Sequence, residues 1–244
     1  MIHVTIYNEF HHEQAQNTTG ERARVNYPDG IHMSLKNNLL ALEPQDFSIT
    51  TYTLENVSEI TKEVLDNTDV LIWWGHVRHA QVPDEVAALV RDAVNNGMGA
   101  IFLHSGHHSK PFRMLLGTPC HLGWRENGDR ELVWVCNPAH PITEGIGRFI
   151  SLEHEEVYCE PFAIPEPDEL VFIGSFEGGE VFRAGCCYRR GNGRIFYFQP
   201  GHETYGSLNH PDVIRVICNA IRWAYPTRRV ELTCPHIGFP MDNN

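Results

Sequence analysis

The first half of the chain alternates between short apolar runs and longer segments whose apolar residues recur every three or four positions. The runs that predict strands are rich in β-branched and aromatic residues: Ile2–Tyr7, Phe47–Leu54, Asp69–Trp74 and Gly99–Leu103. Uninterrupted apolar strands suit a parallel sheet that is buried on both faces. The pattern therefore predicts an α/β domain whose sheet is parallel in its first part.

Amphipathic segments between these strands predict helices. Helices are expected after Gly30, Ser58 and Pro83, and a last one begins at Pro211. In each segment the apolar residues fall on one face at helical spacing. The polar stretch that ends near Pro28 has no such periodicity, so we expect a long loop there, and loops of that length usually carry function.

The pattern changes beyond Cys120. Short strand-like runs follow one another and are joined by Gly-Gly and Gly-Asn-Gly turns: Arg130–Asn137, Leu170–Phe176, Glu180–Arg190 and Gly193–Gly201. Such turns favour hairpins, which predicts a mainly antiparallel extension of the sheet. Because the chain contains neither repeats nor a low-complexity linker, we expect residues 1–244 to form one domain.

The composition narrows the class of ligand. Acidic residues outnumber basic ones by 31 to 19, which gives a formal net charge of −12 at pH 7. Phosphate backbones and anionic membranes require basic surfaces, so we expect no nucleic-acid partner and no membrane partner. A small uncharged substrate fits this charge better. Histidine is unusually frequent, with 15 residues, and it commonly ligates metals and carries protons.

The cysteines indicate neither a disulfide framework nor a zinc ribbon. They are odd in number, form no C-x-x-C pair, and stand at positions 120, 136, 159, 186, 187, 218 and 234. The N-terminus lacks the regions of a secretory signal, and no run reaches the about 18 apolar residues of a membrane span. We therefore expect a cytoplasmic protein. An exposed antiparallel extension would also allow a homo-oligomer.

Polar residues follow the ends of the predicted strands. In an open α/β sheet, ligands bind outside the carboxyl ends of the strands, because the loops converge there. The residues just after these ends are Asn8 and Glu9; His76 and His79; His104, Ser105, His107 and His108; and His202 and Glu203. Histidine stands at several of these ends, which predicts a functional site at this edge of the sheet.

The histidine spacing is compatible with a metal site. Residues three apart face the same way on a helical turn, as His76 and His79 do, and also His104 and His107. Carboxylates are available from Glu9, Glu203, and Glu153 or Glu155. Histidines with a carboxylate would suit a divalent zinc, manganese or iron ion with an open position for a substrate oxygen. The ligands expected on this reading are His76, His79, His104 and His107.

Ser105 offers a different chemistry. A nucleophilic serine at a sharp strand-to-helix turn needs small residues two positions before and after it, and these positions hold Leu103 and His107. His202 and Glu203 would supply a base and its orienting carboxylate. Ser105 followed by Gly106 is equally an ordinary helix-capping pair. The nucleophile and the capping interpretation both stay open.

Aromatic residues near these loops are more often part of the core than platforms for sugars. Trp74 is the exception worth testing, because it precedes the Gly75–His76 turn, and a carbohydrate ring prefers an aromatic face beside polar donors. The residues expected to contact a substrate are Asn8, Glu9, Trp74, His76, His107 and Tyr205.

Several motifs resemble a known family. The segments "DVLIWWGHVRH", "GMGAIFLHSGHHSKPFRMLLGT", "HPITEGIGRF", "EEVYCEPF" and "GRIFYFQPGHETYGSLNHPDVIRVICNAIRWA" look like those of the ThuA-like trehalose-utilisation proteins, in the same order. The resemblance implies a flavodoxin-like three-layer α/β sandwich, related to class I glutamine amidotransferases, with a mainly parallel central sheet and an antiparallel extension. It also implies catabolism of trehalose and related disaccharides, through 3-keto-sugars.

The relationship to amidotransferases bears on Ser105. In that superfamily a cysteine occupies the turn between small residues, and a histidine and a glutamate follow late in the chain. This sequence places Ser105 at the matching position, keeps only Gly106 of the small neighbours, and has His202 and Glu203 in "PGHE". Without the cysteine, glutamine hydrolysis through a thioester is not expected.

Three functional hypotheses follow. The first is an enzyme of sugar catabolism in which His76, His104 and His202 act on sugar oxygens, with Glu9 or Glu203 as a carboxylate partner and a divalent metal. The second is a serine hydrolase or amidase whose catalytic residues would be Ser105, His202 and Glu203. The third is a sugar-binding protein without catalysis.

Overall fold

Strands from both halves of the sequence join into one mixed sheet. The computed structural model describes residues 1–231, and within them the sheet has nine strands in the order β2-β1-β3-β4-β9-β8-β7-β5-β6. The strands are β1 (Ile2–Asn8), β2 (Phe47–Thr53), β3 (Val70–Trp74), β4 (Gly99–Leu103), β5 (Gly123–Val135), β6 (Phe149–Cys159), β7 (Glu169–Phe176), β8 (Val181–Arg190) and β9 (Gly193–Phe198).

The first five strands of this order are parallel. β3 and β4 are buried along their whole length, as expected for strands covered by helices on both faces. In the register, Asn8 pairs with Trp74, Trp74 with Leu103, and Leu103 with Phe198. The carboxyl ends of β1, β3, β4 and β9 therefore lie side by side at one edge.

The other strands pair antiparallel, and this part is larger than expected. β5 and β6 are the longest strands, and the pairings β5–β6, β5–β7, β7–β8 and β8–β9 are all antiparallel. The expectation of a mainly parallel central sheet was wrong: the sheet is mixed and mostly antiparallel. The reason lies partly in β6, whose polar sequence hides its strand character, because only alternate residues of its first part are buried.

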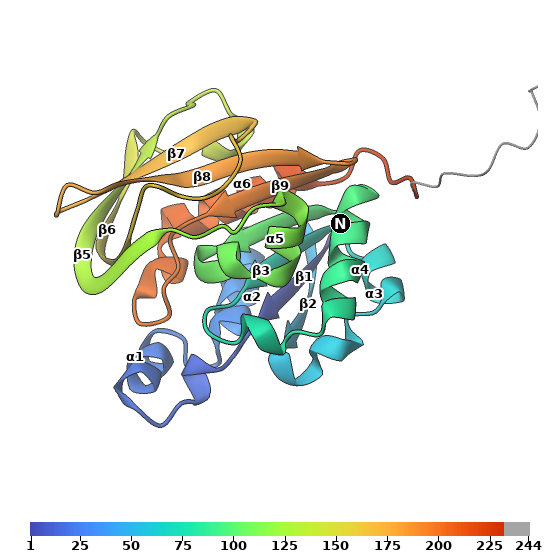
Figure 1. Cartoon of the computed structure of the whole chain (residues 1–244), viewed down its shortest axis with the longest axis horizontal. Coiled ribbons are helices and arrows are strands. Elements are labelled where there is room, and N and C mark those ends of the chain that lie inside the picture. Colours follow the sequence, from blue (N-terminus) through green and yellow to red (C-terminus); the bar gives the residue numbers. More distant parts are fainter. Residues whose placement is uncertain (232–244) are drawn as a thin grey trace, which may run out of the picture.

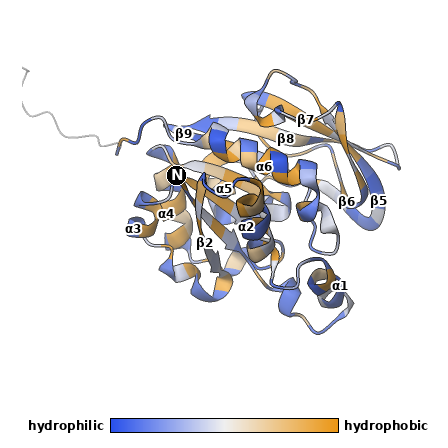
Figure 2. Cartoon of the chain, turned by 180° about the vertical axis from the view of Figure 1, so that it is seen from behind, coloured by the Kyte–Doolittle hydropathy of each residue, from blue (hydrophilic) through white to orange (hydrophobic). Residues whose placement is uncertain are grey.

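Helices cover the two faces of the parallel part. These helices are α2 (Ile31–Leu42), α3 (Lys62–Asp66), α4 (Asp84–Asn95), α5 (Lys110–Leu116) and α6 (Pro211–Ala224), and a further helix, α1 (Thr18–Asn26), lies apart from them (Figure 1). α3, α4 and α5 lie on the face seen in Figure 1, and α2 and α6 lie on the face seen in Figure 2. The apolar stripe of α6 is almost entirely buried against the sheet.

The segment before Pro28, expected to be a loop, contains a helix. α1 begins after Asn17, whose side chain accepts a hydrogen bond from the Gly20 N–H and caps the first turn. Arg24 then donates to the Glu13 and Ala15 carbonyls and ties the helix to the preceding segment. This helix stands away from the sheet (Figure 1). Its few buried residues explain why no apolar periodicity marked it.

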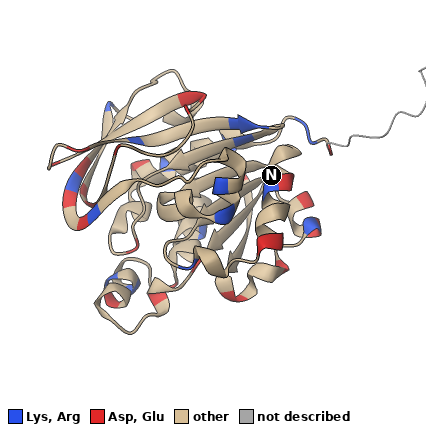
Figure 3. Ribbon diagram, in the orientation of Figure 1, with Lys and Arg blue, Asp and Glu red and all other residues tan. Residues whose placement is uncertain are grey.

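Other features of the described residues concern charge and thiols. Figure 3 shows Lys and Arg interspersed with Asp and Glu, without an element made mainly of basic residues in the described range. The six cysteines up to Cys218 are free thiols, and Cys234 lies outside the described residues. No helix within residues 1–231 is long and apolar enough to cross a membrane.

Candidate functional site

His104 occupies the sharp turn that leaves β4. Its φ is +50°, a left-handed conformation that is rare for a residue other than glycine and that concentrates at functional sites. The chain then enters the 3₁₀ helix η4 (His104–His108). A Cβ on Gly106 would lie 3.0 Å from the Trp73 carbonyl oxygen, so a small residue is needed two positions after His104. The turn therefore centres on His104 and not on Ser105, the residue expected there.

Two hydrogen-bond partners fix the His104 ring. Nδ1 lies 2.9 Å from the backbone carbonyl oxygen of Gln199, and because a carbonyl only accepts, Nδ1 must carry the proton. In the neutral ring Nε2 then has the free lone pair. Nε2 lies 3.2 Å from the Tyr158 hydroxyl and 3.0 Å from Oε2 of Glu156. A backbone carbonyl behind the ring is the arrangement that prepares a histidine to bind a metal through its other nitrogen.

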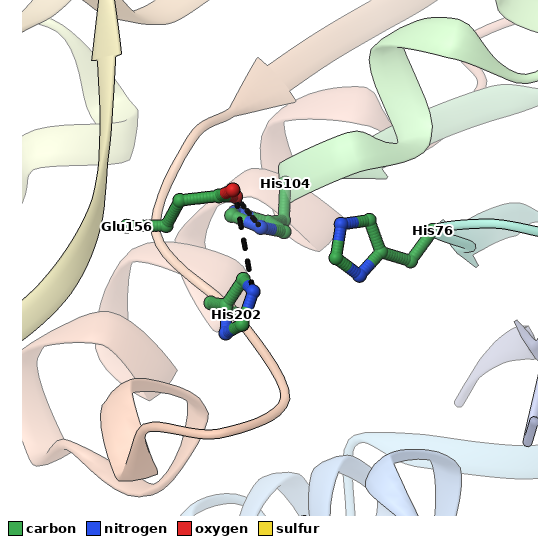
Figure 4. A group of neighbouring side chains, drawn as sticks. All are labelled: His76, His104, Glu156 and His202. Carbon is green, nitrogen blue, oxygen red and sulfur yellow. Dashed lines mark ion pairs between the residues drawn. The ribbon is translucent and has the colours of Figure 1, made fainter. Parts of the chain in front are cut away.

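Four side chains converge on this nitrogen. One ligand atom from each of His76, His104, Glu156 and His202 lies within 4.8 Å of those of the other three, and Figure 4 shows the side chains pointing toward one another. They come from three strand ends, those of β3, β4 and β9, and from the middle of β6. His104, Glu156 and His202 are buried, and His76 is partly buried.

The chemistry of this donor set fits a divalent cation. Within residues 1–231, no hydrogen bond of good geometry reaches Oε2 of Glu156, although this atom is buried and lies 3.0 Å from Nε2 of His104 and 3.9 Å from Nε2 of His202. An acceptor oxygen and a lone-pair nitrogen so close together require a proton or a cation between them. Imidazole and carboxylate ligands each lie about 2.0–2.2 Å from a zinc ion, so ligand atoms that share one are about 3.3 Å apart.

Glu203 forms a second layer behind His76. Its Oε2 lies 2.9 Å from Nδ1 of His76, and its Oε1 lies 3.5 Å from Nδ1 of His12. Burial alone would lower the pKa of His76, but the hydrogen bond and charge of Glu203 outweigh it and raise this pKa to about 9. Burial would likewise raise the pKa of Glu203, yet His76 holds that pKa well below its ordinary value.

His202 is held mainly through its backbone and Thr204. Its Nδ1 lies 2.8 Å from the Thr204 hydroxyl, and burial lowers its pKa to about 4, although the carboxylate of Glu203 opposes this. Oxygens of the buried Glu155 accept from the N–H groups of Gly201 and His202. Glu155 thus supports the loop, whereas the neighbouring Glu156 faces the histidines and Glu153 is exposed.

Glu9 and Asn8 are buried behind the site. Both oxygens of Glu9 accept backbone N–H groups, from His76, Val77 and Arg78, and so fix the loop after β3. Asn8 donates to Glu13 and accepts from the Phe10 N–H. Glu9 is 3% exposed and Asn8 is 0% exposed, so both side chains support the site from within the protein.

The remaining predicted residues lie around the four converging side chains. Trp74 is 0% exposed and donates its indole N–H to the Gly201 carbonyl, so it has no free face for a sugar. The Tyr205 ring packs against His202 at 5.3 Å. Nδ1 of His107 donates to the Cys120 carbonyl at 2.7 Å, and the His79 ring packs against His108 at 5.8 Å.

The structure thus brings together some of the predicted ligands and not others. His76 and His104 converge, while His79 and His107 do not join them. His79 packs against His108, and His107 donates to the Cys120 carbonyl. Ser105 donates to or accepts from the Tyr158 hydroxyl at 2.7 Å. Among the hydrogen bonds of the described residues, none joins Ser105 to His202 or Glu203.

Sequence reasoning missed Glu156 and His12. The sequence predicts a carboxylate from the stretch "LEHEEVY", but through Glu153 or Glu155. The register of β5 with β6 shifts on both sides of Asp129, which pairs with Glu155, so the inward position could not be counted from alternation alone. His12 lies in the polar stretch expected to carry function, and the doublet of His11 and His12 was its only signal.

Residues 3–224 match the model of one protein family, described as ThuA, trehalose utilisation. The chain belongs to the ThuA family. No curated protein matches the sequence. A putative ThuA-like protein of Bacteroides uniformis has a similar structure, with a TM-score of 0.66 and 18% identity over 91% of both chains.

Two further structures show how widely this ThuA-family fold is shared. A cytoplasmic protein of Salmonella typhimurium LT2 is 13% identical, with a TM-score of 0.62 over 92% of this chain and 100% of the other. A glutamine amidotransferase of Thermotoga maritima is 11% identical, with a TM-score of 0.56 over 91% of this chain and 97% of the other. At these identities the similarity shows the fold, which is glutamine amidotransferase-like, and not the reaction.

Proposed function

We propose that this ThuA-family chain is a cytoplasmic enzyme of sugar catabolism that uses a divalent metal and acts on trehalose or a related disaccharide, including its 3-keto form. One observation carries the proposal: His76, His104, Glu156 and His202 place ligand atoms within 4.8 Å of one another, with Oε2 of Glu156 facing Nε2 of His104 without a hydrogen bond. The family supplies the class of substrate.

The four converging side chains would hold the cation. Bound there, a divalent ion supplies Lewis-acid chemistry that polarises a substrate hydroxyl or carbonyl. The Gln199 carbonyl keeps the proton of His104 on Nδ1, and Glu203 orients the ring of His76 through its Nδ1. In both histidines Nδ1 faces the supporting group, so Nε2 points away from it.

Tyr158 is placed to hold a proton next to these residues. Burial, together with the charge of Glu156, raises the pKa of Tyr158 well above its ordinary value, so the hydroxyl stays protonated at neutral pH. It lies within hydrogen-bond distance of both Ser105 and His104. The hydroxyl can therefore donate to a substrate oxygen near His104 without ionising.

The serine hydrolase hypothesis is less well supported by this geometry. A nucleophilic serine requires a hydrogen bond to its base, and Ser105 pairs with Tyr158 instead. His202 directs Nε2 toward Glu156 and Glu203, at 3.9 and 3.7 Å. The histidine expected to be the base thus lies among carboxylates.

Metal binding tests the proposal most directly. Purified protein is stripped with EDTA, and Zn²⁺ and Mn²⁺ are titrated calorimetrically into the wild type, Glu156→Gln and Glu153→Gln. We expect about one equivalent in the wild type, at least tenfold weaker binding in Glu156→Gln, and no change in Glu153→Gln, an exposed residue of the same strand. Equal binding by all three proteins would contradict the proposed ligands.

Turnover then separates an enzyme from a binding protein. The metal-loaded wild type is incubated with trehalose and with 3-keto-trehalose, and products are followed by mass spectrometry. Metal-dependent conversion that is lost in Glu156→Gln supports the enzyme. Saturable sugar binding without conversion would support the non-catalytic sugar-binding protein instead.

A further inference from the structure

A pocket opens directly beside the four converging side chains. Its volume is about 390 Å³, and His76 and Glu156 belong to its wall. Other residues that line it are His79, His108, His121, Trp124 and Glu126. At about 30 Å³ for each water in the liquid, the pocket has room for roughly a dozen water-sized atoms, which is the size of one hexopyranose ring.

Trp124 gives this pocket an exposed aromatic face. The residue lies near the start of β5, paired with Tyr158 of β6, and its side chain is 67% exposed. Trp74, the tryptophan expected to be a sugar platform, is fully buried. An exposed indole on a pocket wall offers a large, rigid surface for the C–H face of a sugar ring.

The pocket also offers hydrogen-bonding atoms that the protein leaves unused. Nε2 of His79 and Nε2 of His108 are buried and have no hydrogen-bond partner among the described residues. The rings of His79, His108 and His121 follow one another at centroid distances of 5.8 and 5.3 Å. Imidazole nitrogens donate or accept according to tautomer, which suits hydroxyl groups that do both.

The formal charge of the pocket wall is negative. Glu126 and Glu156 are the carboxylates, and none of the residues that line the pocket, all within the described part of the chain, is Lys or Arg. Burial lowers the pKa of His79 to about 3 and lowers that of His108, so these rings are uncharged at neutral pH. A phosphate group would meet the like charges of Glu126 and Glu156, and the protonated His76 of the wall is already paired with Glu203 at 2.9 Å.

We propose that this pocket binds one uncharged hexopyranose ring, stacked on Trp124, and excludes sugars that carry a phosphate group. The inference rests on the proposed function in sugar catabolism and adds which sugars the site accepts. The ring would place one edge against His76 and Glu156, which belong to both the pocket and the converging group. Discrimination arises because Glu126 and a phosphate carry like charges, and no Lys or Arg lines the pocket to offset their repulsion.

The stacking part is tested on EDTA-treated protein, by calorimetric titration with trehalose. We expect Trp124→Ala to weaken binding about tenfold and Trp124→Phe to weaken it less than about threefold, because phenylalanine keeps an aromatic face. Phe149→Ala is the matched control, since Phe149 is a partly exposed aromatic residue of the adjacent β6 and does not line the pocket. Unchanged affinity in Trp124→Ala, or an equal loss in Phe149→Ala, would overturn the stacking.

The charge part is tested with trehalose 6-phosphate under the same conditions. We expect the phosphate ester to bind the wild type at least about a hundredfold more weakly than trehalose, and Glu126→Lys to narrow this gap. Equal binding of both sugars by the wild type refutes the exclusion, and so does binding of neither. Because these titrations contain no metal, a failure of metal binding or turnover leaves their result intact, which separates this inference from the proposed function.

Discussion

The charge of Glu203 raises the pKa of His76, and the substitution Glu203→Gln tests how large this effect is. Glutamine keeps the shape of the side chain and can still accept the His76 Nδ1–H, but it carries no charge. With the charge gone, burial is the largest remaining influence, so the pKa of His76 should fall from about 9 to near or below 6.5. A shift from 6.5 to about 9 corresponds to at most roughly 3 kcal/mol between the two protonation states.

The sign of the effect on stability follows from linkage. A histidine whose pKa is raised by folding contributes stability that is complete below pH 6.5 and is lost as the pH rises through 9. Glu203, whose pKa is lowered, is ionised in the folded and unfolded chain across this window and adds no slope there. The wild type should therefore lose its advantage over Glu203→Gln between pH 6.5 and 9, by at most about 3 kcal/mol.

Two measurements on metal-free protein check this prediction. Urea unfolding of the wild type and of Glu203→Gln at several values between pH 6.5 and 9.5 gives the difference in free energy of unfolding. NMR titration of the His76 ring carbon-bound protons gives its pKa, with His76→Gln used for assignment and Glu153→Gln as a control. Parallel stability curves, together with an unchanged His76 pKa, would refute the reasoning.

Three further predictions concern other residues. Ser105→Ala removes one hydrogen bond to Tyr158, so kcat/KM should fall by about tenfold, whereas a loss of about 10⁴-fold would reinstate the nucleophile. Glu131 is fully buried, and burial raises its pKa well above the ordinary value. The wild type then loses stability as the pH rises through that pKa. In urea unfolding, Glu131→Gln should be more stable than the wild type at pH 8 and should lose this advantage toward pH 4. The opposite trend would count against the prediction. Phe102→Ala empties a fully buried site in β4 and should lower the free energy of unfolding by about 3–5 kcal/mol, and a change under about 1 kcal/mol would contradict the packing.

The edge of the sheet that carries the site could be predicted from the sequence. The apolar strands that end before His76 and His104 are short and sharply bounded, and parallel strands bring their carboxyl ends together. His202 follows the last strand in the same way. These residues could be named because their position depends only on local pattern and on a general property of α/β sheets.

The rest depends on contacts that sequence spacing does not reveal. Glu156 enters the site from β6, an edge strand that curves back from the antiparallel part, and its inward direction depends on an irregular register with β5. Likewise, the three-residue spacing of His76 and His79 predicts a shared helical face, but His76 lies in a bend and the short 3₁₀ segment begins only at His79. Spacing rules for helices do not apply where no helix spans both residues.

The origin of the converging side chains has a consequence for folding. His104 and Glu156 are 52 positions apart in the sequence, and His76 and His202 are 126 apart. A fragment that lacks β6 or the segment after β9 cannot assemble the four side chains. The site is therefore complete only when the parallel and the antiparallel parts of the sheet have both folded. A ligand bound by all four side chains would cross-link the parallel and antiparallel parts and stabilise the folded sheet. The fraction of protein with bound ligand would then measure complete folding of the sheet.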